Sequence, residues 1–166
     1  MKPFIAALFS LVLLSGCDVS LNKPTPKVIA SDAGTEQQQR QVYEAAVEFL
    51  QLLDNGKTSE TWSTVSPALK ATTHEMVWTG SLKALRLGLG SFKERTPAGI
   101  GFTDQMPDAP AGNYAVIEFN STFAASTVTE KVLFRDDDKH WLVVGYFVNK
   151  SVIFDKTGQQ DGQTAR

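Results

Sequence analysis

The sequence predicts an α+β fold in which N-terminal helices pack on one face of a curved antiparallel sheet. Apolar residues recur at helical spacing through 36–87, whereas they alternate along the segments that follow residue 90. Helices that come first and strands that follow as a meander indicate segregated layers. With 42% hydrophobic residues, the chain has enough apolar side chains for one buried core.

Local signals at both ends set the bounds of the first predicted helix, 36–54. Thr35 and Gln38 have the spacing of a capping box at its start. Asn55-Gly56 supplies a stop at its end. Between these signals the apolar side chains fall on one face, so the helix is predicted to be amphipathic.

Two further helices are predicted before the spacing of the apolar residues changes from helical to alternating. The first is short and covers 58–65, and Ser66-Pro67 after it matches an N-cap followed by proline at the first helical position. The second covers 74–87, with Thr73 as its expected cap. Two glycines are expected to end it, Gly88 and Gly90.

In the second half of the domain, apolar and polar residues alternate with a period of two, as in β-strands. We expect a strand or a broken pair of strands over 91–103, interrupted near Pro97-Ala98-Gly99. The next segment, 114–123, and the one that contains Val128, Val132 and Phe134 place apolar residues on one face. A solvated hairpin turn is expected over 136–139, followed by a last strand over 141–148.

The N-terminus has the pattern of a secretory signal peptide. A basic start is followed by an apolar run from Phe4 to Leu14, which is shorter than the roughly 20 residues of a membrane span. Leu14-Ser15-Gly16-Cys17 resembles the lipobox of bacterial lipoproteins. The resemblance implies that residues 1–16 are removed and that Cys17 carries the acyl chains, such as palmitate, that hold the protein on a membrane.

Composition divides the remainder into a tether, one domain and a tail. Residues 17–34 contain Pro24 and Pro26 but few large apolar side chains, which indicates a flexible lipidated tether. The single α+β domain is expected over 35–150, and a polar flexible tail over 151–166. Asp18 after the cysteine resembles the signal that retains lipoproteins of enteric bacteria at the inner membrane, with the domain in the periplasm.

The domain resembles a bacterial family, the domain of unknown function 4019 family, over about 41–149. The match is carried by spaced landmarks: Trp62, Trp78, Arg86 with Leu87-Gly88, Arg95, Pro107, Pro110, Gly112, Tyr114, Phe119, Phe123, Glu130, Trp141, Val143, Gly145 and Tyr146. The resemblance implies a cystatin-like cone of the nuclear-transport-factor-2 type. It implies no established activity, and the sequence departs from the family pattern at Asp108 and Lys139, both in predicted loops.

No pattern in the sequence indicates an enzyme. There is no nucleophile elbow, phosphate loop or dinucleotide fingerprint. His74 and His140 lack a second ligand at metal-binding spacing, and the acidic residues at 136–138 lack the spacing of a calcium loop. We therefore expect no catalytic residues, no metal and no cofactor.

Glu130 with Arg86 or Arg95 is the most informative polar set. Glu130 alternates in phase with Val128 and Val132, so its side chain is expected to point inward. An unpaired carboxylate there would be costly, and we favour a buried ion pair with one of the arginines. A ligand-binding pair in a pocket between helices and sheet is the alternative.

The expected function is binding, without catalysis. The formal net charge of −2 and the scattered basic residues give no electrostatic footprint for nucleic acid. A membrane-anchored envelope lipoprotein that acts as a protein-interaction or accessory module is the first expectation, with an envelope protein as its partner. The alternative is a small-molecule binding or sensing domain. An exposed apolar patch would favour the first, and an apolar cavity with Arg86 or Glu130 at its wall would favour the second.

Overall fold

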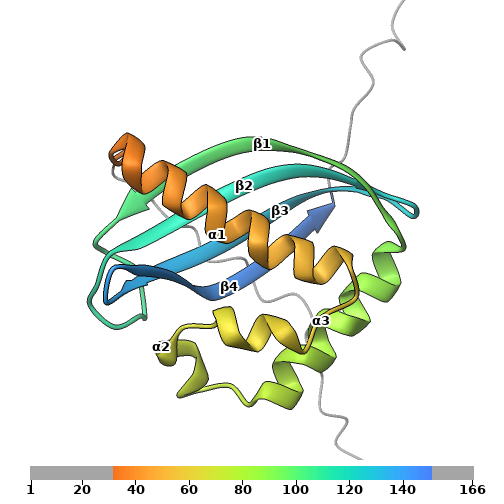
Figure 1. Cartoon of the computed structure of the whole chain (residues 1–166), viewed down its shortest axis with the longest axis horizontal. Helices are drawn as coiled ribbons and strands as arrows, with labels where there is room; N and C mark the ends of the chain where they lie inside the picture. Colours follow the sequence, from red (N-terminus) through yellow and green to blue (C-terminus); the bar gives the residue numbers. More distant parts are fainter. Residues whose placement is uncertain (1–31, 151–166) are drawn as a thin grey trace, which may run out of the picture.

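A computed structural model describes residues 32–150 of the chain. In order, its elements are α1 (Glu36–Asp54), the 3-10 helix η1 (Glu60–Thr64), α2 (Pro67–Lys70), α3 (Glu75–Leu89), β1 (Phe92–Thr103), β2 (Tyr114–Phe123), β3 (Thr127–Asp137) and β4 (His140–Lys150). The strands form a four-stranded antiparallel sheet in the order β1-β2-β3-β4 (Figure 1). The α+β class and the meander are therefore confirmed. No helix within this range has the length and hydropathy needed to span a membrane.

The local signals explain α1. Its N-terminus has both hydrogen bonds of a capping box, because Thr35 accepts from the Gln38 amide and Gln38 accepts from the Thr35 amide. Its C-cap is Asn55, and Gly56 follows with a φ of 73°. The predicted bounds are confirmed, because every signal that sets them acts within one helical turn.

The third helix begins and ends later than predicted. Its N-cap is His74, not Thr73, because the backbone of His74 is extended while its carbonyl already accepts from the amides of Val77 and Trp78. The helix also continues through Gly88 to Leu89, and its C-cap is Gly90, which has a φ of 77°. Gly90 can adopt that conformation without a Cβ clash, so it turns the chain directly into β1.

The strands differ from the prediction in two details. β1 is continuous, and the proline segment produces a register shift between Pro97 and Gly99. The β3–β4 turn is shorter than expected, with Asp138 and Lys139 at positive φ. The expectation that residue 137 lies in a solvated turn is wrong, because the Asp137 carboxylate accepts hydrogen bonds from Ser66 and Arg135.

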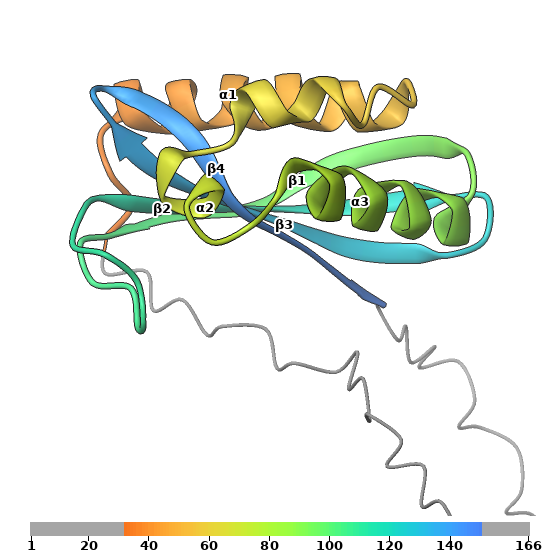
Figure 2. The same ribbon diagram turned by 90° about the horizontal axis from the view of Figure 1, so that it is seen from below.

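The core lies between α1 and the sheet face that it crosses (Figure 2). Phe49 on α1 is fully buried and meets the ring of Tyr146 edge-on at 5.5 Å. The sheet contributes fully or nearly fully buried side chains: Ala115, Ile117, Phe119, Val132, Phe134 and Val143. The face under α1 is therefore filled by side chains.

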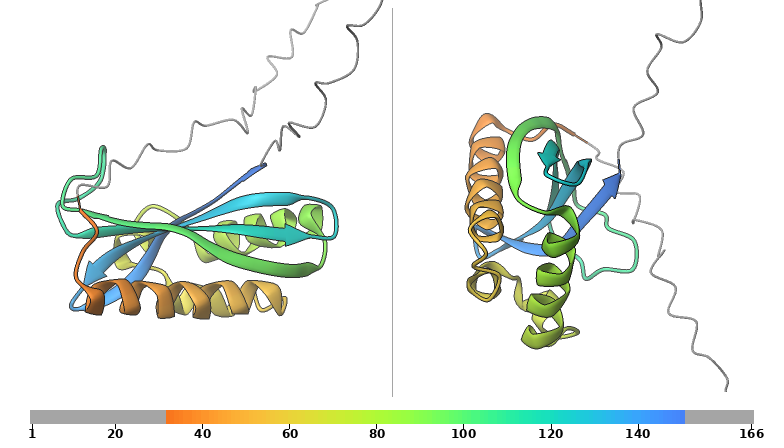
Figure 3. Two further views of the ribbon diagram at one scale, coloured as in Figure 1. Left: turned by 90° about the horizontal axis from the view of Figure 1, so that it is seen from above. Right: turned by 90° about the vertical axis from the view of Figure 1, so that its right-hand side faces the viewer.

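The third helix runs beside the β4 side of the sheet (Figures 1 and 3). Leu82 joins the main core, while Leu85 and Leu89 pack in a smaller cluster with Phe123, Val128 and Val148. At the other end of the domain, Asp32 pairs with Phe102 through two backbone hydrogen bonds. The last residues of the predicted tether thus contact β1.

Candidate functional site

Glu130 occupies the centre of the polar site. It lies in β3 opposite Phe119 and Val148, and its side chain is fully buried. Arg86 Nη2 is 3.2 Å from its Oε1 atom, and Arg95 Nη2 is 2.7 Å from its Oε2 atom. The hydroxyls of Ser121 and Tyr146 each donate a further hydrogen bond to it. These contacts offset the hydration that the carboxylate loses on burial.

Asp54, the last residue of α1, is the second acid of the site. Arg95 holds it with two hydrogen bonds, of 2.7 Å to Oδ2 and 3.2 Å to Oδ1. Arg86 Nη1 is 3.1 Å from Asp54 Oδ1. We refer to Asp54, Arg86, Arg95 and Glu130 as the buried charge cluster. Its positive and negative charges balance, and it connects α1, α3, β1 and β3.

The turn after α3 brings both arginines to the same carboxylate. Arg86 lies in the last turn of that helix and Arg95 near the start of β1, on either side of Gly90. Each guanidinium also lies over an aromatic ring, Arg86 at 4.9 Å from the centroid of Phe123 and Arg95 at 4.5 Å from that of Phe92. Ring stacking of this kind favours arginine over lysine at both positions.

Burial and neighbouring charges shift the pKa values of two groups in the site, Arg95 and Tyr146. Burial alone would lower the pKa of Arg95, but hydrogen bonding and charge attraction from Asp54 and Glu130 outweigh it and raise that pKa. Burial, reinforced by the neighbouring Glu130 charge, raises the pKa of Tyr146 well above its ordinary value. Both shifts move the pKa further from neutral pH, so Arg95 stays charged and Tyr146 stays neutral at pH 7.

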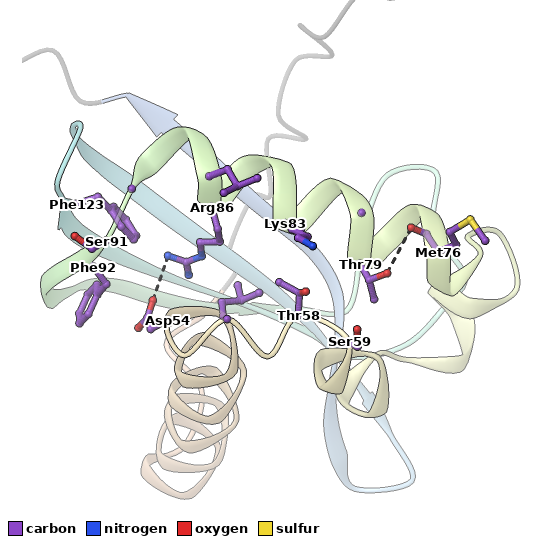
Figure 4. Close-up of a pocket in the computed structure, with 15 residues that line it drawn as sticks. Asp54, Thr58, Ser59, Met76, Thr79, Lys83, Arg86, Ser91, Phe92 and Phe123 are labelled. Carbon is purple, nitrogen blue, oxygen red and sulfur yellow. Dashed lines mark hydrogen bonds and ion pairs between the residues drawn. The ribbon is translucent and has the colours of Figure 1, made fainter.

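An open groove of about 780 Å³ adjoins the charge cluster. It lies between the end of α1, the loop after it, and one side of α3 (Figure 4). Lys83 and Arg86 extend from α3 toward the side where Asp54 and Thr58 lie. The lining also includes large apolar side chains: Leu53, Met76, Leu87, Phe92 and Phe123.

Arg86 forms part of the groove wall and keeps unused hydrogen-bonding capacity. Its Nε and Nη1 atoms are buried and have no hydrogen-bond acceptor. Nη1 is close to Asp54, but the contact is an ion pair without hydrogen-bond geometry. Because both atoms are buried, a ligand in the groove cannot reach them unless the side chains around them move.

The structure brings together all three residues that the sequence singled out, since Arg86 and Arg95 both contact Glu130. Sequence reasoning missed Asp54, Ser121 and Tyr146. Ser121 had a signal, because it lies in phase with Phe119 and Phe123 as a polar residue on the inward face. Asp54 follows buried Leu53 at the end of its helix, but nothing local shows that an arginine from a strand reaches it.

Other expected features lie elsewhere or outside the described residues. His74 caps α3, and His140 is an exposed residue that starts β4. Within residues 32–150, His, Asp and Glu side chains form no group of three or more that could hold a metal ion. The lipidation site expected at Cys17, the signal peptide and the C-terminal tail lie outside the described part of the chain.

A comparison with protein-family models matches residues 45–146 to the family described as "Protein of unknown function (DUF4019)". The chain belongs to this family. The matched segment runs from the middle of α1 to Tyr146, so the DUF4019 region includes the whole buried charge cluster. No curated protein and no solved structure matches the chain.

Proposed function

We propose that the protein is a lipid-anchored lipoprotein of the bacterial envelope whose domain binds another envelope protein. The observation that carries this proposal is the exposure of large apolar side chains along α3: Met76 is 84% exposed, Val77 59% and Leu87 76%. Groups of exposed apolar residues beside a groove are typical of interaction surfaces. Buried side chains of the core fill the face under α1, which favours a binding surface outside this face.

The wider setting of this proposal comes from the sequence. A signal peptide that ends before Cys17 supports export and lipid attachment, and Asp18 favours retention at the inner membrane with the domain in the periplasm. We also infer that the domain is a cystatin-like cone of the nuclear-transport-factor-2 type. The long antiparallel strands and a helix that crosses one sheet face support that inference.

The anchor gives a first expected result. The wild-type protein should partition into the detergent phase, and Cys17→Ser should abolish lipid attachment, because only the cysteine thiol can carry the diacylglyceryl group. Phase partitioning and the mass of the N-terminal peptide measure both effects. A Cys17→Ser protein that is still processed and still partitions into detergent would contradict lipidation at this residue.

The binding surface gives a second expected result. A photoreactive amino acid in place of Leu87 should form a covalent adduct with a protein in intact cells, whereas the same group in place of exposed Glu48 on α1 should not. Adding Met76→Glu should reduce the Leu87-site adduct about tenfold, because a charge then faces the apolar contact. Circular dichroism checks that the fold is kept, as expected for a side chain that is 84% exposed.

Small-molecule binding is a second candidate function. The open groove of about 780 Å³, with Lys83 and Arg86 in its lining, favours it. The photoreactive variant distinguishes the two candidates, because a small-molecule adduct changes the mass of the chain by far less than a protein. If no adduct forms at position 87, protein binding through α3 is contradicted.

A further inference from the structure

We propose that the groove beside α3 binds a segment of the partner protein that carries an acidic side chain between apolar side chains. This inference rests on the proposed function and specifies the chemistry of the partner. It follows from the charge that the groove leaves uncompensated, from the hydrogen-bond donors in its wall and from the order of side chains along α3.

The first step is the charge balance of the groove. Asp54 and Glu130 are each held by Arg86 and Arg95, so the buried charge cluster has no net charge. Lys83 also lines the groove, and it makes no ion pair or hydrogen bond with the described residues. The groove therefore presents one uncompensated positive charge, which a carboxylate of the partner would neutralise.

The second step is the supply of hydrogen-bond donors. Lys83 lies one helical turn before Arg86, is exposed and lines the groove. Its ammonium has three N–H donors, and no described residue accepts a hydrogen bond from them. A carboxylate of the partner placed beside Lys83 would accept a charge-assisted hydrogen bond, so the groove favours an acidic group over a purely apolar one.

The third step is the order of side chains along the helix. Met76, Gly80, Lys83 and Leu87 follow one side of α3 over roughly 16 Å. The cation thus lies between two exposed apolar residues. Apart from its chain neighbours and the backbone of its own helix, no described atom lies within 4 Å of the position that a Cβ of Gly80 would occupy, which leaves room for close approach of a partner. An extended or helical peptide segment can contact all of these positions together, whereas a small ligand would leave Met76 or Leu87 in water.

The test uses the full-length lipidated chain with the photoreactive amino acid at position 87, in intact cells. We expect Lys83→Glu to reduce the protein adduct at least about tenfold, because it places like charges together. Lys139→Glu is the matched control, since it makes the same charge change at an exposed turn residue far from the groove, and it should leave the adduct unchanged. Sequencing of the cross-linked peptide should identify an Asp or Glu near the point of attachment.

Replacing that acid with lysine in the partner should restore the adduct with the Lys83→Glu chain. An adduct that forms equally well with Lys83→Glu and Lys139→Glu would overturn the inference while leaving protein binding in place. A cross-linked peptide from a second copy of this chain, from its own tail, or from a lipid would overturn it in favour of that occupant. If no adduct forms with any version, the proposed function itself fails.

Discussion

Glu130→Ala is expected to lower the free energy of unfolding by about 3–5 kcal/mol. The substitution removes one acid from a buried cluster, so Arg86 and Arg95 then share only Asp54. It also leaves the Ser121 and Tyr146 hydroxyls without their acceptor. Urea denaturation followed by tryptophan fluorescence measures the change.

Glu118→Ala is the matched control for this prediction. Glu118 lies on the neighbouring strand and pairs with Lys131, but both side chains are about one-third exposed. Solvent screens such a pair, so its loss should cost about 1 kcal/mol or less. Equal and small effects of the two substitutions would show that the buried charge cluster contributes little to stability.

Arg95→Met should destabilise the domain by a similar amount, about 3–5 kcal/mol. Arg95 is the only described residue that gives Asp54 two hydrogen bonds, and it also contacts Glu130. Without it, the Arg86 guanidinium alone faces two carboxylates, so the cluster gains an uncompensated negative charge. Methionine keeps much of the side-chain length, so the loss of stability comes mainly from the missing charge and hydrogen bonds.

The double variant Arg95→Met/Glu130→Gln tests whether charge balance is the cause. It removes one positive and one negative charge together, so its loss of stability should be clearly smaller than the sum of the losses measured for Arg95→Met and for Glu130→Gln alone. Arg40→Met, at an exposed position of α1, should change stability by only about 0.5 kcal/mol. Additive losses in the double variant would contradict electrostatic coupling within the cluster.

The inward position of Glu130 was predictable because the period of a strand is two. Once Val128 and Val132 are assigned to the core, the residue between them in the same phase must share their face. The sequence left open which arginine pairs with it, and the structure shows that both do. Side-chain reach from two elements decides this, and no local pattern encodes it.

The errors at the start of α3 and at the β3–β4 turn have a different origin. Thr73 was the expected cap of α3, but the N-cap is the next residue, His74, whose side chain makes no capping hydrogen bond. The backbone decides the position of the cap, because the carbonyl of His74 accepts the first helical hydrogen bonds. The position of Asp137 was mistaken for a related reason, since its partner Ser66 lies 71 positions away and gives no signal near the turn.

By itself, the sequence determined the α+β class, the bounds of α1, the order of the strands and the inward face of β3. The bounds of α1 and the inward face of β3 depend on residues within one helical turn or on a repeat along one strand. The class and the strand order follow from the succession of these patterns along the chain. Only the tertiary structure decided that Asp54 joins Glu130 through shared arginines, and that Met76 and Leu87 remain exposed beside Lys83. These features depend on how α1, α3 and β1 approach one another. The packing of the whole core fixes that arrangement, so no single segment of the sequence encodes it.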